Sequence, residues 1–301
     1  MKYKPYLLQD VYDAAAQNKF NVISTFAGGG GSSTGYRLSG GNVLCVNEFV
    51  PTAQETYKEN YPDTPIIPDD IKKLSGQEFL DITGLKSGEL DVLDGSPPCS
   101  AFSMAGNLSH GKGNSHKDAF GKTKGYSDIK EVTNVEDLFF EFLRVADVIK
   151  PKVIIAENVA GLTMGEAKQY FNKIQNTFED IGYDVCAKVL NSGYFGVPQT
   201  RNRVFFIGLR NDITTKVGLT FMNIHGIFPS ESKSMVKLGD ALDDLEYDDG
   251  MWSIAPGYGF GLIKGSTFST IPSGYSINII TPYGFDIGPL YYNISFAIAG
   301  F

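Results

Sequence analysis

Residues 21–35, NVISTFAGGGGSSTG, decide the fold of this chain. The apolar run NVISTF is typical of a buried strand. The glycines Gly28–Gly31 that follow it permit a tight turn and a close backbone approach to a ligand. A helix is expected near 33–39. The dinucleotide fingerprint GxGxxG is not matched, because Ser33 or Thr34 occupies the third glycine position. A tight turn without a ligand therefore stays open as an alternative at this point.

The same alternation of strand and helix continues through the first two thirds of the chain. Strands are expected at 21–26, 41–48, 65–67, 89–96, 152–158, 183–191 and 203–210. Helices are expected at 33–39, 52–60, 134–149 and 166–181, with a further helix within 6–18. This pattern predicts an α/β fold with a mostly parallel seven-stranded sheet and helices on both faces. Its ligand crevice should lie at the carboxyl ends of the strands.

The pattern changes after residue 210. Segment 211–301 is rich in Gly, Tyr, Ile and Ser, and only 237–245 looks helical. We therefore expect two domains. The first, 1–210, holds the sheet, and the second, 211–301, is a small irregular C-terminal lobe.

Composition limits the class of protein. The hydrophobic fraction is 42% and the charged fraction 20%, which is ordinary for a soluble globular protein. No apolar run approaches the roughly 18 residues that cross a bilayer, and the N-terminus lacks the apolar core of a signal peptide. We therefore expect no membrane contact and a cytoplasmic location. The net charge of −8 disfavours a general nucleic-acid coat. Segment 110–130 is locally basic, either as a solvated loop or as a phosphate contact.

The three cysteines have different settings. Cys45 and Cys186 lie in apolar runs and are expected to be buried strand residues. Cys99 ends the sequence GSPPC (95–99), in which two prolines stiffen the loop after the fourth strand. At the mouth of the crevice, Cys99 is a candidate nucleophile, with an incidental loop cysteine as the alternative. Neither a disulfide framework nor a metal site is expected, because no CxxC pair is present.

Two charged motifs accompany the last strands. Glu157 ends a buried strand, where partial desolvation would favour its protonated form and suit it to donate a proton. Arg201 and Arg203 lie in QTRNR (199–203). We expect these arginines to point in opposite directions, one into the pocket and the other toward a phosphate or an internal carboxylate. A surface acid and two solvated arginines are the alternatives.

The order of the motifs is more specific than any one of them. Six motifs follow one another: FAGGGG (26–31), NE (47–48), DI (70–71), PPC (97–99), ENV (157–159) and QTRNR (199–203). This order resembles the cytosine-C5 DNA methyltransferase family over about residues 20–210. The resemblance implies a Rossmann-like class I methyltransferase fold. It also implies S-adenosyl-L-methionine as the cofactor and S-adenosyl-L-homocysteine as the product.

The resemblance also assigns cofactor contacts. The glycine loop would pack on the cofactor through Phe26, Ala27, Gly28, Gly30 and Gly31. Glu48 would bind the ribose hydroxyls, and Phe49 would lie against the adenine ring. Asp70 would accept from the adenine amino group, and Ile71 would line that ring. Pro98 would border the pocket shared by cofactor and base.

The implied reaction is methyl transfer to carbon 5 of cytosine in double-stranded DNA. Cys99 would attack carbon 6, which makes carbon 5 nucleophilic, and Glu157 would hydrogen-bond N3 and the amino edge. Arg203 would contact the carbonyl oxygen, and Arg201 would support the loop or the site. The family flips the target base out of the duplex, which favours phosphate contact for the lysines of 110–130.

The sequence departs from the family at its end. Two late family motifs, an Arg-Leu-rich helix and a Gly-Asn-x-Val core, are not found in 211–301. Three interpretations stay open: one subunit of a split enzyme with a second protein chain, an altered product, or a divergent end. A non-catalytic module that binds cofactor or DNA is a further alternative. Methylation of tRNA is disfavoured, because no cysteine lies beyond Cys186. A bacterial or phage setting is favoured, and restriction-modification, phage self-protection and regulation stay open as roles.

Overall fold

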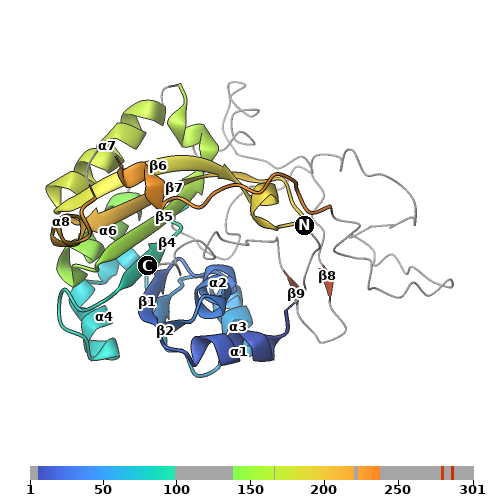
Figure 1. Ribbon diagram of the computed structural model, residues 1–301. Coiled ribbons are helices and arrows are strands. Elements are labelled where there is room, and N and C mark those ends of the chain that lie inside the picture. The colour runs from blue at the N-terminus through green and yellow to red at the C-terminus, as the bar shows by residue number, and fades with distance from the viewer. Residues whose placement is uncertain are drawn as a thin grey trace, which may run out of the picture.

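A seven-stranded mixed sheet forms the centre of the molecule (Figure 1). The computed structural model describes residues 6–98, 138–165, 167–219 and 223–237, with the backbone of 279–280 and 286–287. The strands are β1 (Phe20–Thr25), β2 (Gly41–Asn47), β3 (Ile66–Ile67), β4 (Val92–Gly95), β5 (Val153–Val159), β6 (Tyr183–Asn191) and β7 (Asn202–Arg210). Their order is β3-β2-β1-β4-β5-β7-β6, and β7 runs antiparallel to both neighbours while the other pairs are parallel. The predicted mostly parallel seven-stranded sheet is confirmed.

Helices cover both faces of this sheet (Figure 1). The α-helices are α1 (Leu8–Ala15), α2 (Gly31–Leu38), α3 (Pro51–Asn60), α4 (Gly76–Thr83), α6 (Leu138–Ile149), α7 (Ala167–Asp180) and α8 (Asn211–Val217). Short 3-10 turns are η1 (Ile71–Lys73), η4 (Ala160–Thr163), η5 (Ser192–Phe195) and η6 (Ile224–Ile227). A separate antiparallel pair joins β8 (Ile279–Ile280) to β9 (Asp286–Ile287). Among the described residues, no helix is long and apolar enough to cross a membrane.

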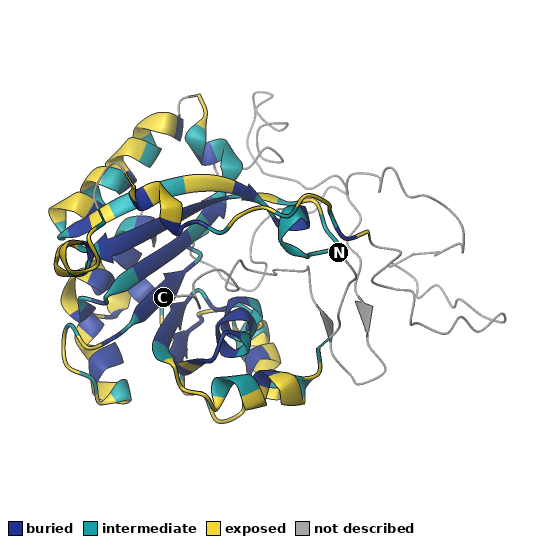
Figure 2. Ribbon diagram, in the orientation of Figure 1, coloured by how far each residue is buried: buried dark blue, intermediate teal, exposed yellow. Residues whose placement is uncertain are grey.

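Alternation along the strands assigns each helix layer to a face. Neighbouring strand residues point to opposite sides of a sheet. Ile23 and Leu93 accordingly belong to the core with α4, α6 and α7, while Val22 and Val92 belong to the core with α1, α2 and α3. Figure 2 shows the central strands buried between these layers. The sheet is therefore packed on both sides, and its polar strand ends are what remain for a site.

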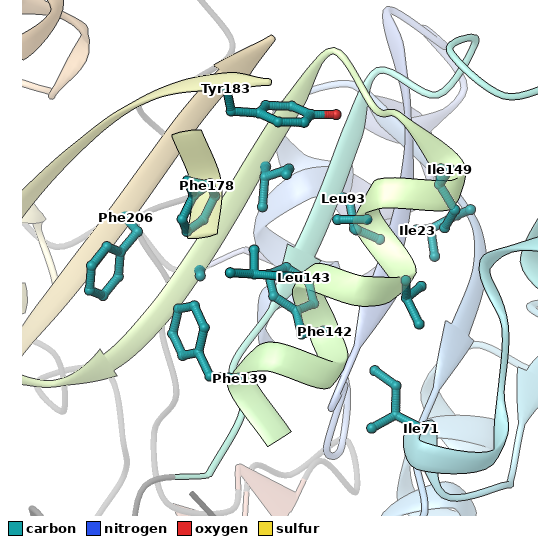
Figure 3. Packing of buried hydrophobic residues seen from close by; sticks show 14 of the residues in the cluster. Ile23, Ile71, Leu93, Phe139, Phe142, Leu143, Ile149, Phe178, Tyr183 and Phe206 are labelled. Carbon is teal, nitrogen blue, oxygen red and sulfur yellow. The ribbon is translucent and has the colours of Figure 1, made fainter. Parts of the chain in front are cut away.

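An aromatic cluster fixes the β5–β7 part of the sheet (Figure 3). The Phe206 ring centroid lies 5.4 Å from that of Phe139 and 6.3 Å from that of Phe178. Gly208, two residues along β7, leaves room for Phe178, because a Cβ there would lie 2.7 Å from its ring. Phe139, Phe178 and Phe206 are all at most 1% exposed. This packing holds in place the two strands that carry Glu157 and Arg203.

Two helices were not predicted from the sequence. α4 is missing from the prediction, although Ser75 and Glu78 form a capping box at its start. α8 contradicts the prediction that only 237–245 is helical beyond residue 210, and 238–245 lies outside the described residues. α8 is short and rich in β-branched residues, so it lacks a clear helical period. It contacts β6 and β7, and η6 contacts β6, so the described chain packs on the sheet beyond residue 210.

Candidate active site

The turn after β1 is strained and open, as a ligand loop requires. Phe26 has a φ of +53°, a left-handed conformation that non-glycine residues rarely adopt. Gly28 and Gly30 follow with φ of +55° and +97°. A Cβ on Gly30 would lie 3.0 Å from the Tyr61 ring, whereas one on Gly28 would meet nothing within 4 Å. The loop is thus packed from below at Gly30 and open at Gly28, and Gly31 begins α2.

The acid at the end of β2 is joined directly to this loop. Glu48 is 7% exposed, and its Oε2 accepts from the Gly28 N–H at 2.7 Å. Its Oε1 accepts from the Val50 N–H at 2.8 Å. Each carboxylate oxygen has two lone pairs, so both can still accept from hydroxyl donors. Beside Glu48, the Phe49 side chain is 41% exposed and presents an apolar ring to a ligand. The predicted pair of glycine loop and acid therefore comes together in space.

Asn47 connects this acid to the next candidate, Asp70. The Asn47 Nδ2 donates to the carbonyls of Ile67 at 2.9 Å and Asp69 at 2.8 Å. This side chain ties the end of β2 to the loop after β3. The sequence analysis gave Asn47 no role, although it lies beside Glu48 in the NE motif.

Asp70 and Ile71 have different surroundings. The Asp70 Oδ1 accepts from the Lys72 N–H at 3.0 Å, which caps η1 and leaves further lone pairs. Ile71 is 2% exposed and lies in the core with α4 and α6 (Figure 3). Its side chain therefore offers almost no free surface, in contrast to the ring-lining position that the family resemblance implies.

The loop after β4 is tied to two neighbouring elements. Ser96 Oγ donates to the Phe26 carbonyl at 3.3 Å, which joins this loop to the glycine turn. Asn158 Nδ2, at the end of β5, donates to the Pro97 carbonyl at 3.2 Å. Pro98 is the last described residue of the loop. Cys99 and the lysines of 110–130 lie outside the described residues. The segment that leads to Cys99 is thus anchored where the glycine loop and the ENV motif meet.

Glu157 and Arg203 form an ion pair across β5 and β7. The Arg203 Nε lies 2.6 Å from the Glu157 Oε1, and the side chains are 23% and 14% exposed. Burial raises the pKa of Glu157, and the charges of Arg203 and Arg201 only partly oppose that rise. The direction agrees with the expectation that desolvation favours the protonated acid. A carboxyl group here can hold or release a proton near neutral pH.

The expected divergence of Arg201 and Arg203 is wrong. Both positive charges act on the same carboxylate, that of Glu157. Residues two apart in an extended segment lie on the same side, so an opposite orientation was the incorrect premise. Both arginines thus belong to one electropositive group around Glu157.

Asp94 is a buried acid that the sequence analysis missed. It lies at the end of β4 and is 8% exposed. Its Oδ2 accepts from Ser24 Oγ at 2.8 Å and from Ser32 Oγ, and its Oδ1 accepts from Tyr36 OH at 3.0 Å. Burial raises the pKa of Asp94, against the effect of these three hydroxyl donors. An acid inside the apolar strand sequence DVLDG could have identified it, since a buried carboxylate requires partners.

The described part of the chain offers no other obvious reactive group. Burial raises the pKa of the Cys45 and Cys186 thiols to about 12, so neither forms a thiolate near neutral pH. Both are buried strand residues, as predicted. In the described residues, no group of three or more His, Cys, Asp or Glu side chains could hold a metal ion.

The sheet order, the glycine loop after β1 and the acid at the end of β2 define a Rossmann-like methyltransferase. The family model for the C-5 cytosine-specific DNA methylase matches residues 20–257. The chain belongs to this family, as the sequence resemblance indicated, and the family implies use of S-adenosylmethionine.

Individual relatives agree with the family. The chain is 30% identical over 233 residues to the Type II methyltransferase M.NgoPII of Neisseria gonorrhoeae, covering 76% of this chain and 58% of that protein. It is 30% identical over 260 residues to the Type II methyltransferase M.Eco47II of Escherichia coli, covering 86% and 54%. The chain thus spans about half the length of these curated relatives.

A solved structure shares the fold. It is that of a prophage-encoded E. coli protein with a proposed role as a DNA modification methyltransferase. The TM-score is 0.56 at 24% identity, over 74% of this chain and 54% of the other.

Proposed function

We propose that this protein transfers a methyl group from S-adenosylmethionine to carbon 5 of cytosine in double-stranded DNA, with Cys99 as the nucleophile. The observation that carries the proposal is the Glu157–Arg203 pair at 2.6 Å, in which burial raises the pKa of the acid. A polar ring that gains negative charge during attack needs both a proton donor and a cation beside it. The pair supplies both, next to the loop that leads to Cys99.

The described residues fit the cofactor. Glu48 has free lone pairs for the ribose hydroxyls, and the exposed ring of Phe49 suits an adenine face. The backbone of Phe26, Ala27, Gly28, Gly30 and Gly31 would border the cofactor, with open space at Gly28. Asp70 would accept from the adenine amino group, Ile71 would contribute its backbone edge, and Pro98 would border the shared pocket. S-adenosylmethionine supplies an electrophilic methyl group on a sulfonium when bound.

The residues of the chain would activate the base in a fixed order. The Cys99 thiolate forms a bond to carbon 6 of a flipped cytosine, and Glu157 gives its proton to N3 as electrons move into the ring. Arg203 holds the carbonyl oxygen, while Arg201 adds positive charge beside the acid. Carbon 5 takes the methyl group, a base removes its proton, the bond from Cys99 breaks and the N3 proton returns to Glu157. Base entry would replace the direct contact of Glu157 with Arg203.

DNA contact is assigned outside the sheet. The lysines of 110–130 would meet phosphates, and residues within 211–301 would select the target sequence. The division at residue 210 stays a prediction. A second chain is also a prediction from the sequence alone, and nothing in the described residues favours it.

Transfer of a radiolabelled methyl group from S-adenosylmethionine tests the function. We expect label in duplex DNA, little in tRNA, and none in either with Cys99→Ser. Bisulfite sequencing of DNA from expressing cells would then give the target sequence. Cofactor binding and DNA binding without any label transfer would instead identify a non-catalytic module and contradict the proposal.

A further inference from the structure

The end of β4 contacts the glycine loop on both sides. Before the loop, Ser96 Oγ donates to the Phe26 carbonyl at 3.3 Å. After the loop, Asp94 accepts from Ser32 in the first turn of α2 and from Tyr36 OH at 3.0 Å one turn later. Phe26, Gly28 and Gly30, which all have positive φ, lie between these two contacts. The strained turn is therefore clamped by one strand end.

The three hydroxyl donors to Asp94 differ in what they connect. Ser24 lies on β1 directly opposite Asp94, and the backbone ladder already fixes that pairing. Ser32 and Tyr36 lie on α2, which no ladder connects to β4. The Asp94 carboxylate is thus a polar link from α2 to β4, and β4 leads directly to Pro97 and Pro98. It is buried, so water cannot easily replace a lost donor.

The same carboxylate also acts on the catalytic side of the sheet. The charge of Asp94 contributes to the raised pKa of Glu157, although burial of Glu157 is the larger cause. Asp94 therefore lies between the loop assigned to the cofactor and the acid assigned to the base.

We propose that Asp94 is a positioning residue that holds α2, and with it the Gly28–Gly31 turn, at the distance from β4 that cofactor binding requires. It acts through Ser32 and Tyr36 and does not itself touch the cofactor. This inference rests on the proposed use of S-adenosylmethionine.

A matched pair of substitutions tests it. Ser24→Ala and Ser32→Ala each remove one hydroxyl from the same oxygen of Asp94, one on β1 and one on α2. Affinity for S-adenosylhomocysteine is measured by isothermal titration calorimetry and Tm by scanning calorimetry. We expect Ser32→Ala to weaken binding about fivefold, less than the full worth of a charged hydrogen bond. Ser24→Ala should lower Tm similarly while keeping native affinity.

Two further variants keep the test decisive. Tyr36→Phe keeps the ring and should weaken binding about as much as Ser32→Ala, and Asp94→Asn should weaken it about tenfold. If Ser32→Ala and Tyr36→Phe bind as tightly as Ser24→Ala, Asp94 is structural only and the inference is overturned. If the native chain does not bind S-adenosylhomocysteine, the proposed cofactor fails and the inference fails with it. The two failures are thus distinguishable.

Discussion

Glu157 shows what a single residue can reveal before and after its surroundings are known. Its place at the end of an apolar strand predicts a desolvated acid, and the structure agrees. Its partner could not be predicted, because Arg203 is 46 positions away and the two meet only through the β5–β7 pairing. Asp94 is harder still, since its three hydroxyl partners come from segments 58 to 70 positions away. Sequence predicts the environment of such acids better than their contacts.

The raised pKa of Glu157 predicts a particular pH profile. The protonated acid is the active form, and a raised pKa keeps it protonated to higher pH than an ordinary Glu. Methyl transfer should therefore fall as pH rises through that pKa. Glu157→Gln should lower kcat by about 10² to 10⁴ and remove this pH limb, because an amide does not titrate there. Steady-state kinetics across pH measures both effects.

The control for this substitution is Glu179→Gln, on the exposed end of α7. It removes the same charge away from the site, and its rate and pH profile should match those of the native chain. An unchanged high-pH limb in Glu157→Gln would assign the titration to another group.

At the scale of elements, the strands were predicted well and the helices less evenly. The strand predictions rest on continuous apolar runs such as VIIA and VFFI, which a sheet buried on both faces requires. α4 and α8 are only 8 and 7 residues long and supply few turns in which a period can appear. The cap residues of α4, rather than its periodicity, identify it.

A buried cation joins the helices that flank the glycine loop. Arg37 on α2 is 5% exposed, and its guanidinium carbon lies 3.8 Å from the Tyr61 ring centroid. It also donates to Thr64 Oγ1 at 2.7 Å. We expect Arg37→Met to lower the free energy of unfolding by about 2 kcal/mol, through loss of the cation–π contact and this hydrogen bond. Urea denaturation measures it.

Lys168→Met, an exposed position on α7, is the matched control and should change stability by less than about 0.5 kcal/mol. Equal effects of the two substitutions would show that Arg37 contributes no more than a surface cation.

The contact of β4 with α6 gives a second stability prediction. A Cβ on Gly95 would lie 2.6 Å from the Phe142 ring and 2.8 Å from Thr25 Oγ1. Gly95→Ala should therefore cost about 1–3 kcal/mol through overpacking. Gly226→Ala, in η6, meets nothing within 4 Å and should be nearly neutral. Thermal unfolding of both variants compares them, and a native-like Gly95→Ala would mean that α6 can move away from β4.

For the whole molecule, the six motifs predicted both the family and the architecture because their order follows the ends of successive strands. The family match extends to residue 257, beyond the 210 positions assigned to the sheet domain from sequence. That boundary rested on composition, and composition does not report that α8 and η6 pack on β6. Ile71 shows the limit of carrying a role over by motif, since its side chain lies in the core.

The most direct test of the whole account is a covalent complex with duplex DNA that contains 5-fluorocytosine, in the presence of S-adenosylmethionine. Fluorine at carbon 5 blocks the final proton removal, so the bond from Cys99 to carbon 6 should persist. We predict a denaturation-resistant complex with native protein, its attachment at Cys99 by peptide mass spectrometry, and none with Cys99→Ser. An absent complex with native protein, or one that persists in Cys99→Ser, would contradict the account.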